Sequence, residues 1–289
     1  VHQAAADLET PMGQLGRLFN QFFRYALGYG ALYQVLNFFR FMAVGVADLN
    51  KELYSIQAVA GVTAREMQGV GAAIKAVALS TKFSVTEIAL AAKTLVQAGV
   101  ETDALPKVLQ ATARFAAAAD SDISTAADLI STVRDVYSEL DDNTIANQLT
   151  RAVNISKLTA EDLRTILSLG AQTAQGFNLT SEQYLAAVST LRNAGIKAST
   201  VATGLRQAML EIFNPDEKTL KAFKDRYEQM GENISQEEIR SRFYSFKYAD
   251  NPLAAGVAEL KRLGFGGESQ KTLQRVFDVR AVNAIQALI

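Results

Sequence analysis

Residues that commonly perform catalysis are scarce in this chain. It has 289 residues, a single histidine at His2, and no cysteine. A histidine-dependent triad, a two-histidine metal motif, a thiolate metal site and a disulfide are therefore excluded within it. Carboxylates remain, and a pair of them could in principle cleave a glycosidic bond, as in a muramidase.

One acidic cluster, formed by Glu139, Asp141 and Asp142, offers such a pair. The order Asp141, Asp142, Asn143 is more typical of a turn followed by a helix cap, because Asp and Asn side chains accept hydrogen bonds from nearby backbone amides. We therefore predict that the chain is not an enzyme and that it binds no cofactor or metal.

Phosphate groups and nucleic acids are not indicated as ligands either. Gly28-x-Gly30 and Gly264-x-Gly266 lack the preceding strand and the following Lys-Ser or Lys-Thr that a phosphate-binding loop needs. The 29 lysines and arginines nearly cancel the 30 acidic residues, so no whole-chain basic field attracts DNA or an anionic membrane. We expect no sequence-specific binding of nucleic acid.

The chain is patterned for helices. It contains only 4 prolines, and its 49% apolar and 20% charged residues are ordinary for a globular protein. Ser84 with Glu87, and Thr180 with Gln183, have the spacing of a capping box. We predict an all-α fold, with an N-terminal long helix or coiled coil followed by a multi-helix, alanine-rich core.

Glycines mark predicted helix ends. Gly99 and Gly195 stand where a helix C-terminus adopts a left-handed conformation. The segments that they close, 84–100 and 180–196, read as diverged copies of one unit with a capped start and an Ala-Ala centre. Further interruptions of the helical pattern are predicted at Gly170, Pro215, Gly231 and Pro252.

A dense pattern of small residues and leucines follows the second of these glycines. Its members are Gly195, Ile196, Ala198, Ser199, Ala202, Thr203, Leu205, Arg206, Leu210 and Pro215. With this pattern the chain resembles the core region of phage tail tape measure proteins, a family with an alanine-rich multi-helix segment. The resemblance covers residues 50–289 and is strongest over 180–215.

Apolar residues recur at alternating spacings of four and three between residues 18 and 77. In residues 48–77, seven of nine heptad positions are large and apolar, namely Leu49, Leu53, Ile56, Met67, Val70, Ile74 and Val77. A strict heptad repeat predicts a coiled-coil seam and self-association. An amphipathic helix of a globular bundle shows the same stripe over shorter runs, and Gly61, Gly69 and Gly71 would loosen a continuous helix.

Residues 19–46 are apolar on nearly every face, so protein or lipid has to enclose them. Only 15 uncharged residues separate Arg24 from Arg40, fewer than the roughly 20 that a spanning helix needs. This length favours a second layer of protein. Membrane insertion at some stage stays open, because a single arginine can snorkel.

Residues 214–289 are the most densely charged part of the chain. Asn214 and Pro215 have the types of an N-cap and a first helical residue, and residues 270–289 are predicted to form a last amphipathic helix. Lysines and arginines at 218–226 lie near the acids Glu217, Asp225 and Glu228, as on a solvated helix face with mixed pairs. A docking face for the tail tube or tip is the alternative.

These patterns divide the chain into four segments. They are an irregular lead-in at 1–17, a long helix or coiled coil at 18–80, a multi-helix core at 84–213, and charged helices with a final amphipathic helix at 214–289. The chain starts without methionine and stops inside a helical pattern, so we expect a piece of a longer polypeptide. No signal peptide is legible.

The resemblance implies a structural virion protein. Such a protein would be assembled in the host cytoplasm, set tail length from the tube lumen near the tip, and be released on DNA ejection. Its expected partners are further copies of itself, as a trimer, and the tail tube and tail tip or baseplate hub proteins. A membrane-active ejection or pore-forming protein that contacts the host membrane is the alternative, and a helical lytic enzyme is a third class.

A ruler needs a continuous helix, whose length counts residues. The predicted helix breaks between residues 84 and 289 therefore indicate a folded end anchored at the tail tip, with the ruler itself in other sequence.

Overall fold

The computed structural model describes residues 49–61 and 63–289, and every regular element in this part is a helix. The predicted all-α class is confirmed. The lead-in at 1–17 and the apolar segment at 19–46 lie outside the described residues. Residues 52–289 form one compact unit, whose arrangement is described below.

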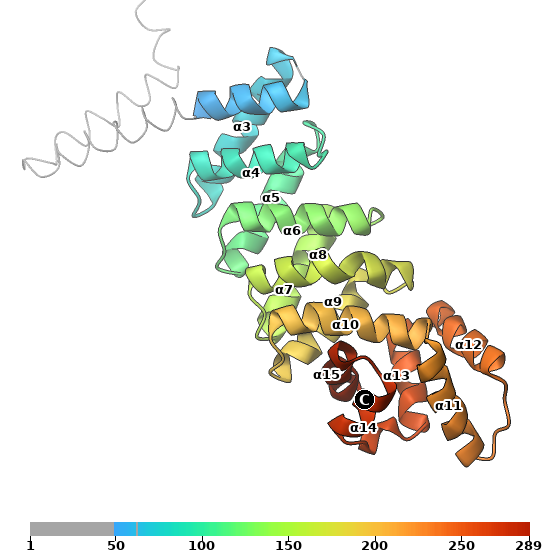
Figure 1. Ribbon diagram of the computed structural model, residues 1–289. Helices are drawn as coiled ribbons and strands as arrows, with labels where there is room; N and C mark the ends of the chain where they lie inside the picture. Colours follow the sequence, from blue (N-terminus) through green and yellow to red (C-terminus); the bar gives the residue numbers. More distant parts are fainter. Residues whose placement is uncertain (1–48, 62) are drawn as a thin grey trace, which may run out of the picture. The chain divides into compact units, whose positions relative to one another are not determined.

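A helix at residues 49–60 precedes the labelled elements of Figure 1. The labelled helices are α3 (Ala64–Ser80), α4 (Val85–Gln97), α5 (Leu105–Ala118), α6 (Ile123–Val136), α7 (Asp142–Ile155), α8 (Ala160–Gly176), α9 (Ser181–Asn193), α10 (Ala198–Phe213), α11 (Glu217–Gln229), α12 (Gln236–Ser245), α13 (Pro252–Arg262), α14 (Gln270–Val276) and α15 (Val279–Leu288). Two short 3-10 helices, η2 (Phe246–Tyr248) and η3 (Phe265–Gly267), flank α13.

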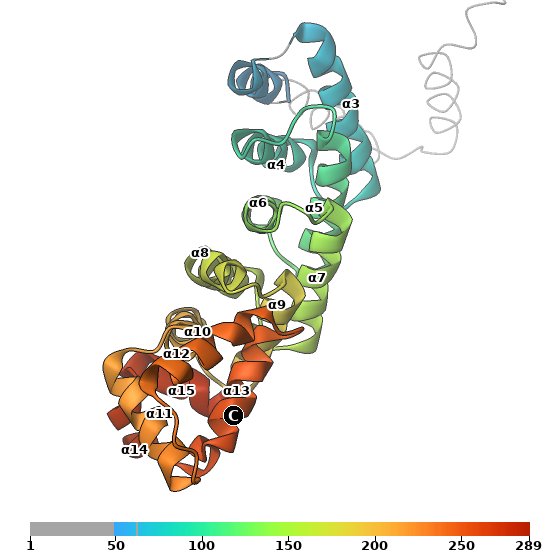
Figure 2. The same cartoon turned by 90° about the vertical axis from the view of Figure 1, so that its right-hand side faces the viewer.

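Helices α3 to α10 stack in two layers. Helices α4, α6, α8 and α10 pack one on the next in one layer, and α3, α5, α7 and α9 do so in the other (Figure 1, Figure 2). Successive helices of the first layer start 37 or 38 residues apart, at Val85, Ile123, Ala160 and Ala198. Such stacking of helix pairs is the architecture of an α-solenoid.

The two segments that look like copies of one unit in the sequence lie in different layers. Residues 84–100 contain α4, whereas residues 180–196 contain α9. Their similarity therefore lies in how each helix is capped, and it does not mark equivalent places in the repeat. The true period of 37 or 38 residues relates alternate helices, which the sequence pattern alone did not reveal.

Helix ends follow the predicted chemistry. The amide of Ser84 donates to Glu87 Oε2 at 2.7 Å while the amide of Glu87 donates to Ser84 Oγ at 3.2 Å. Thr180 and Gln183 exchange the same pair of bonds at 3.1 and 3.2 Å. Gly195 has φ +85°, a left-handed conformation that costs glycine little. The capping boxes and the left-handed glycines are confirmed.

Gly170 is not a helix end, contrary to the prediction. It lies inside α8, facing Tyr184 of α9, and a Cβ built on it would come within 2.0 Å of the tyrosine hydroxyl. That hydroxyl donates to the backbone oxygen of Ile166 at 3.1 Å. This glycine thus serves close packing between two helices.

The long helix predicted for residues 18–80 is also interrupted within its described part. Residues 49–60 are helical, Gly61 has φ +65°, and α3 begins anew after its N-cap Thr63. The side chain of Glu66 accepts from the Thr63 amide at 2.7 Å, which completes a capping box. A new capped start of this kind ends one helix and begins the next.

Helices α11 to α14 and η3 form a second core, which is aromatic. Phe223, Phe243, Phe265 and Phe277 are buried, and their ring centroids lie 4.5 to 6.0 Å apart in the contacting pairs. Helix α15 leaves this cluster to pack on α10, where Gly204 allows close approach: a Cβ there would lie 2.7 Å from the backbone oxygen of Arg280.

Two predicted boundaries near the C-terminal end are wrong. Asn214 is the C-cap of α10, and Asp216 caps α11 by accepting from the Thr219 amide at 2.7 Å. The single helix predicted for residues 270–289 is two helices, because Phe277 is extended and Asp278 caps α15.

Candidate interaction surfaces

The predicted seam residues are mostly covered by the chain itself. Six of the seven are buried: Leu49, Ile56, Met67, Val70, Ile74 and Val77. Helix α3 packs on α4 and α5, so packing inside one chain accounts for its apolar stripe. Self-association through these residues stays a prediction.

The motif of residues 195–215 builds one joint, in which α9 ends, the chain turns and α10 begins. Gly195 and Ile196 close α9: their amides donate to Arg192 O at 3.0 Å and to Leu191 O at 3.2 Å. Ala202 and Leu205 are buried in α10, whereas Thr203 and Arg206 are exposed on its outer face. Pro215 is buried beyond the helix end. The motif thus combines a helix stop, core positions and a short exposed stripe.

Arg192 ties this joint to the preceding turn. Its guanidinium donates to Ile196 O at 2.8 Å, to Lys157 O at 3.1 Å and to Asp162 Oδ2 at 3.0 Å. Asn193 adds a bond from its side-chain amide to Ile155 O at 3.1 Å. The end of α9 is therefore fixed to the loop between α7 and α8.

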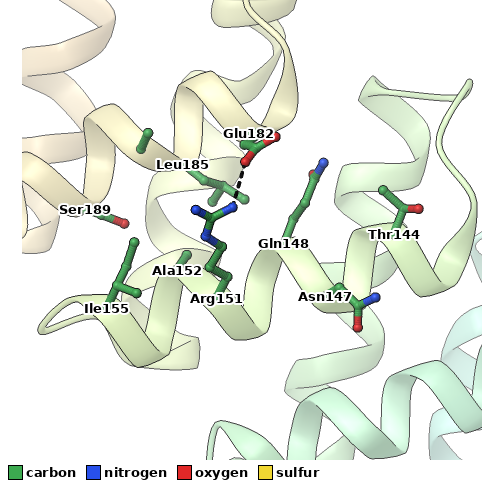
Figure 3. Close-up of a pocket in the computed structure, with 10 residues that line it drawn as sticks. Thr144, Asn147, Gln148, Arg151, Ala152, Ile155, Glu182, Leu185 and Ser189 are labelled. Atoms are coloured by element: carbon green, nitrogen blue, oxygen red, sulfur yellow. Dashed lines mark hydrogen bonds and ion pairs between the residues drawn. The ribbon is translucent and has the colours of Figure 1, made fainter.

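A groove of about 370 Å³ lies between α7 and α9 (Figure 3). Arg151 and Glu182 form an ion pair of 3.0 Å across it, and both side chains are largely exposed. Ser189 is 3% exposed and its hydroxyl has no partner within the described part of the chain. Gln148 Oε1 in the same groove is likewise buried and unpaired there. The groove could accept a polar group of modest size.

Two of the three acids considered for catalysis, Asp141 and Asp142, have structural partners. Asp141 caps α7, accepting from the amides of Asn143 at 3.0 Å and Thr144 at 3.3 Å. The hydrogen bond from the Thr144 hydroxyl is the largest influence that lowers the pKa of Asp141. Asp142 pairs with Arg134 at 3.0 Å. The cap at Asp141 confirms the turn-and-cap interpretation, and the ion pair accounts for Asp142.

The charged face of α11 is partly used in packing. Arg226 pairs with Glu268 and lies over the Phe265 ring at 5.2 Å, and Lys224 pairs with Glu228 at 3.5 Å. Lysines 218 and 221 are exposed. A solvated face with mixed pairs describes α11, and its use for docking stays a prediction.

A polar network around the buried Tyr227 joins α11, α12 and α13. The hydroxyl of Tyr227 donates to Glu259, and Arg262 donates to the same carboxylate at 2.7 Å. The guanidinium groups of Arg242 and Arg262 lie 5.3 and 5.2 Å from the Tyr227 ring centroid. Burial, reinforced by the bond to the carboxylate, raises the pKa of Tyr227 to about 12.

The burial of one carboxylate, that of Glu211, could not be predicted from the sequence. Glu211 of α10 is 7% exposed and accepts from the Asp278 amide at 3.0 and 3.2 Å, on its two oxygens. The Gln207 side chain donates to it at 3.1 Å. Burial raises the pKa of Glu211, and the nearby carboxylates of Asp278 and Asp216 act in the same direction. This contact holds the start of α15 against α10.

Residues 49–61 and 63–289 contain neither a candidate membrane span nor a candidate metal cluster. No helix there is both long and apolar enough to cross a bilayer. No cluster of three or more acidic, histidine or cysteine side chains there could hold a metal ion. The segment on which the membrane prediction rests, 19–46, lies outside this range.

Comparisons with known proteins point in one direction. A family model described as "Phage-related minor tail protein" matches residues 71–278. The chain is 23% identical over 248 residues to the "Tape measure protein" of Pneumococcus phage Dp-1, an overlap that covers 84% of this chain and 20% of that protein. The chain therefore spans about a fifth of the length of this relative. No solved structure matches it.

Proposed function

The chain belongs to the phage-related minor tail protein family, and from this membership we propose that it is the folded, tip-anchored segment of a tape measure protein. The family gives it a structural role in a phage tail and a place in the virion. The finer proposal is that it lies in the tube lumen near the tip, takes part in setting tail length, and is released on DNA ejection.

The repeat spacing of the stack supports an anchoring role. A continuous helix of 37 residues extends about 55 Å, at 1.5 Å per residue. In the two-layer stack each 37 or 38 residues add one helix to each layer, and packed helices lie only about 8–10 Å apart. Since the stack gains little length per residue, it suits an anchor better than a ruler.

Deletion of one repeat tests this proposal. Removing residues 123–159, which hold α6 and α7, from the full-length protein should change tail length by no more than about 10 Å, the spacing of packed helices. A ruler would shorten the tail by about 55 Å. Tail lengths in electron micrographs decide between these outcomes, and circular dichroism of the purified variant shows whether it still folds. Tails shortened by the larger amount would contradict the anchor.

Partners of the proposed segment are further copies of itself, as a trimer, and the tail tube and tip proteins. Light scattering of the 289-residue chain, beside a truncation lacking residues 1–80, tests the first. A trimer that becomes a monomer on truncation supports association through the N-terminal segment. A monomer in both cases leaves the heptad stripe as intramolecular packing alone.

A further inference from the structure

Two exposed tyrosines and a lysine are grouped at the end of α12 and on η2. Tyr244 is 48% exposed and Tyr248 is 72% exposed. The ammonium of Lys247 lies 3.8 Å from the Tyr244 ring centroid and 4.8 Å from that of Tyr248, and it donates to the Tyr244 hydroxyl. Large aromatic side chains this exposed, around one cation, are typical of interface anchors.

The turn that carries the group is held by the neighbouring stack. The side-chain amide of Asn178, which follows α8, donates to Lys247 O at 3.1 Å. Gln183 of α9 donates to Asp250 O at 2.6 Å. A turn fixed in this way loses little conformational freedom when a partner binds, which favours affinity.

The charge of Lys247 is available to an incoming anion. The arginines nearby in the fold already have carboxylate partners: Arg240 pairs with Glu217, Arg242 with Glu232, and Arg262 with Glu232 and Glu259. No carboxylate of the described part lies within 4.0 Å of the Lys247 ammonium. The bond to the Tyr244 hydroxyl raises the pKa of Lys247, so the cation persists at neutral pH.

A protein partner fits this group better than a nucleic acid does. Binding to nucleic acid depends on several cations that neutralise successive phosphates, whereas here there is one ammonium, three residues before the exposed Asp250, in a chain of net charge −1. One carboxylate, by contrast, is matched by one ammonium, and phenol hydroxyls can donate to it as well.

We propose that Tyr244, Lys247 and Tyr248 form a docking site for a carboxylate-bearing segment of a partner protein. The inference rests on the proposed function in one respect: the partner is another protein of the tail. The two tyrosine rings bind apolar surface around the carboxylate, and the lysine selects its charge.

Fluorescence anisotropy with the 289-residue chain tests the site directly. The probe is a dye-labelled peptide of alternating glutamate and leucine, with a glutamine–leucine peptide and a single-stranded oligonucleotide as comparisons. Binding of the acidic peptide should weaken by about tenfold or more in Lys247→Gln, as for a close charge pair at an interface. Lys271→Gln, at an exposed lysine of α14, is the matched control and should change the affinity by less than about twofold.

Three results would overturn the proposal. They are equal binding of the glutamine peptide, equal loss in the two lysine variants, and tighter binding of the oligonucleotide that depends on Lys247. Because this assay uses the chain in solution, it is independent of tail length. Phage carrying Lys247→Glu should assemble fewer tails, and those tails should have normal length. Loss of docking therefore changes the number of tails, whereas failure of the anchor role changes their length.

Discussion

The stack of α3 to α10 and the cluster of α11 to α14 bury apolar surface in different ways. The stack uses small side chains: α4 alone buries Ala89, Ala91 and Ala92 completely. The cluster instead surrounds Phe223 with three other phenylalanine rings, and adds the Tyr227 network of ion pairs. Alanine lets neighbouring helices approach closely, whereas the phenylalanines fill one shared space.

This difference sets how far a local change should spread. In a stack each helix contacts its neighbours only, so stability is approximately a sum of local terms. In the cluster, α11, α12 and the end of α14 each supply a ring to one aromatic core, and α13 joins them through the Tyr227–Glu259 contact, so the loss of one ring affects all four. The stack should therefore open locally and the cluster as a unit.

The largest predicted effect is that of Phe223→Ala. Removing a fully buried ring costs about 3–5 kcal/mol of unfolding free energy. This loss should destabilise α11 to α14 together. Hydrogen exchange measured by mass spectrometry should show all four helices losing protection, while α4 to α8 keep theirs.

Leu129→Ala in α6 is the matched change in the stack. This leucine is also fully buried, and its truncation costs about 2–5 kcal/mol. Faster exchange is expected in α6 and in its layer neighbours α4 and α8, with α11 to α14 unaffected. Uniform loss of protection in either variant would show that the two regions unfold as one.

Local features of this fold could be predicted from the sequence. The capping boxes at Ser84 and Thr180 and the stop at Gly195 involve residues within a few positions of one another. Their geometry is set by the backbone of one helix end, so spacing and residue type suffice. The cap at Asp141 and the helix start at Pro252 follow the same rule.

Features that depend on distant contacts could not be predicted. In the sequence Gly170 resembles a helix stop, but its role is to leave room for Tyr184 of the next helix. Residues 270–289 show one helical pattern, yet Phe277 turns into the aromatic core and Glu211, far away in the sequence, holds the Asp278 amide. The grouping of Lys247 with Tyr244 and Tyr248 likewise depends on a turn that Asn178 and Gln183 hold.

Gly170→Ala probes the close packing of α8 and α9 in the stack. The new methyl would overlap the Tyr184 hydroxyl, which has to move and lose its bond to Ile166 O. We expect a loss of about 1–3 kcal/mol, from overpacking and an unsatisfied group. In thermal unfolding, the double variant Gly170→Ala, Tyr184→Phe should lose less unfolding free energy than the two single variants lose together. Strict additivity would mean that the two residues do not compete for space.

Gly195→Ala and Gly176→Ala compare one substitution in two backbone conformations. Gly195 has φ +85° with open space around it, so alanine adds strain of about 1–2 kcal/mol without a clash. Gly176 ends α8 with no neighbouring atom within 4 Å and no positive φ, so alanine should be neutral or stabilise by up to about 1 kcal/mol. Urea unfolding measures both. Equal effects would contradict the interpretation of Gly195 as a left-handed helix stop.

The smallest expected effect lies at Glu211, where α10 meets the start of α15. Burial raises its pKa in the folded chain, so the folded state favours the protonated form. A raised pKa contributes stability that is full below the unfolded value, near 4.5, and is lost as the pH rises through the folded value. Glu211→Gln keeps an oxygen for the Asp278 amide and removes the titration.

The difference in unfolding free energy between Glu211→Gln and the unchanged chain should therefore grow in favour of the variant from pH 4 towards neutrality. Glu228→Gln, at an exposed carboxylate of α11 that pairs with Lys224, is the control and should give a difference of about 0–1 kcal/mol. The amide of Asp278 opposes the effect of burial, because its hydrogen bonds favour the charged carboxylate. If the unfolding free energy of the unchanged chain instead rose relative to that of the variant with rising pH, the effect of those bonds on the pKa of Glu211 would outweigh that of burial. The joint between α10 and α15 would then be an ionic cap, held by charge in the same way as the helix starts of the stack.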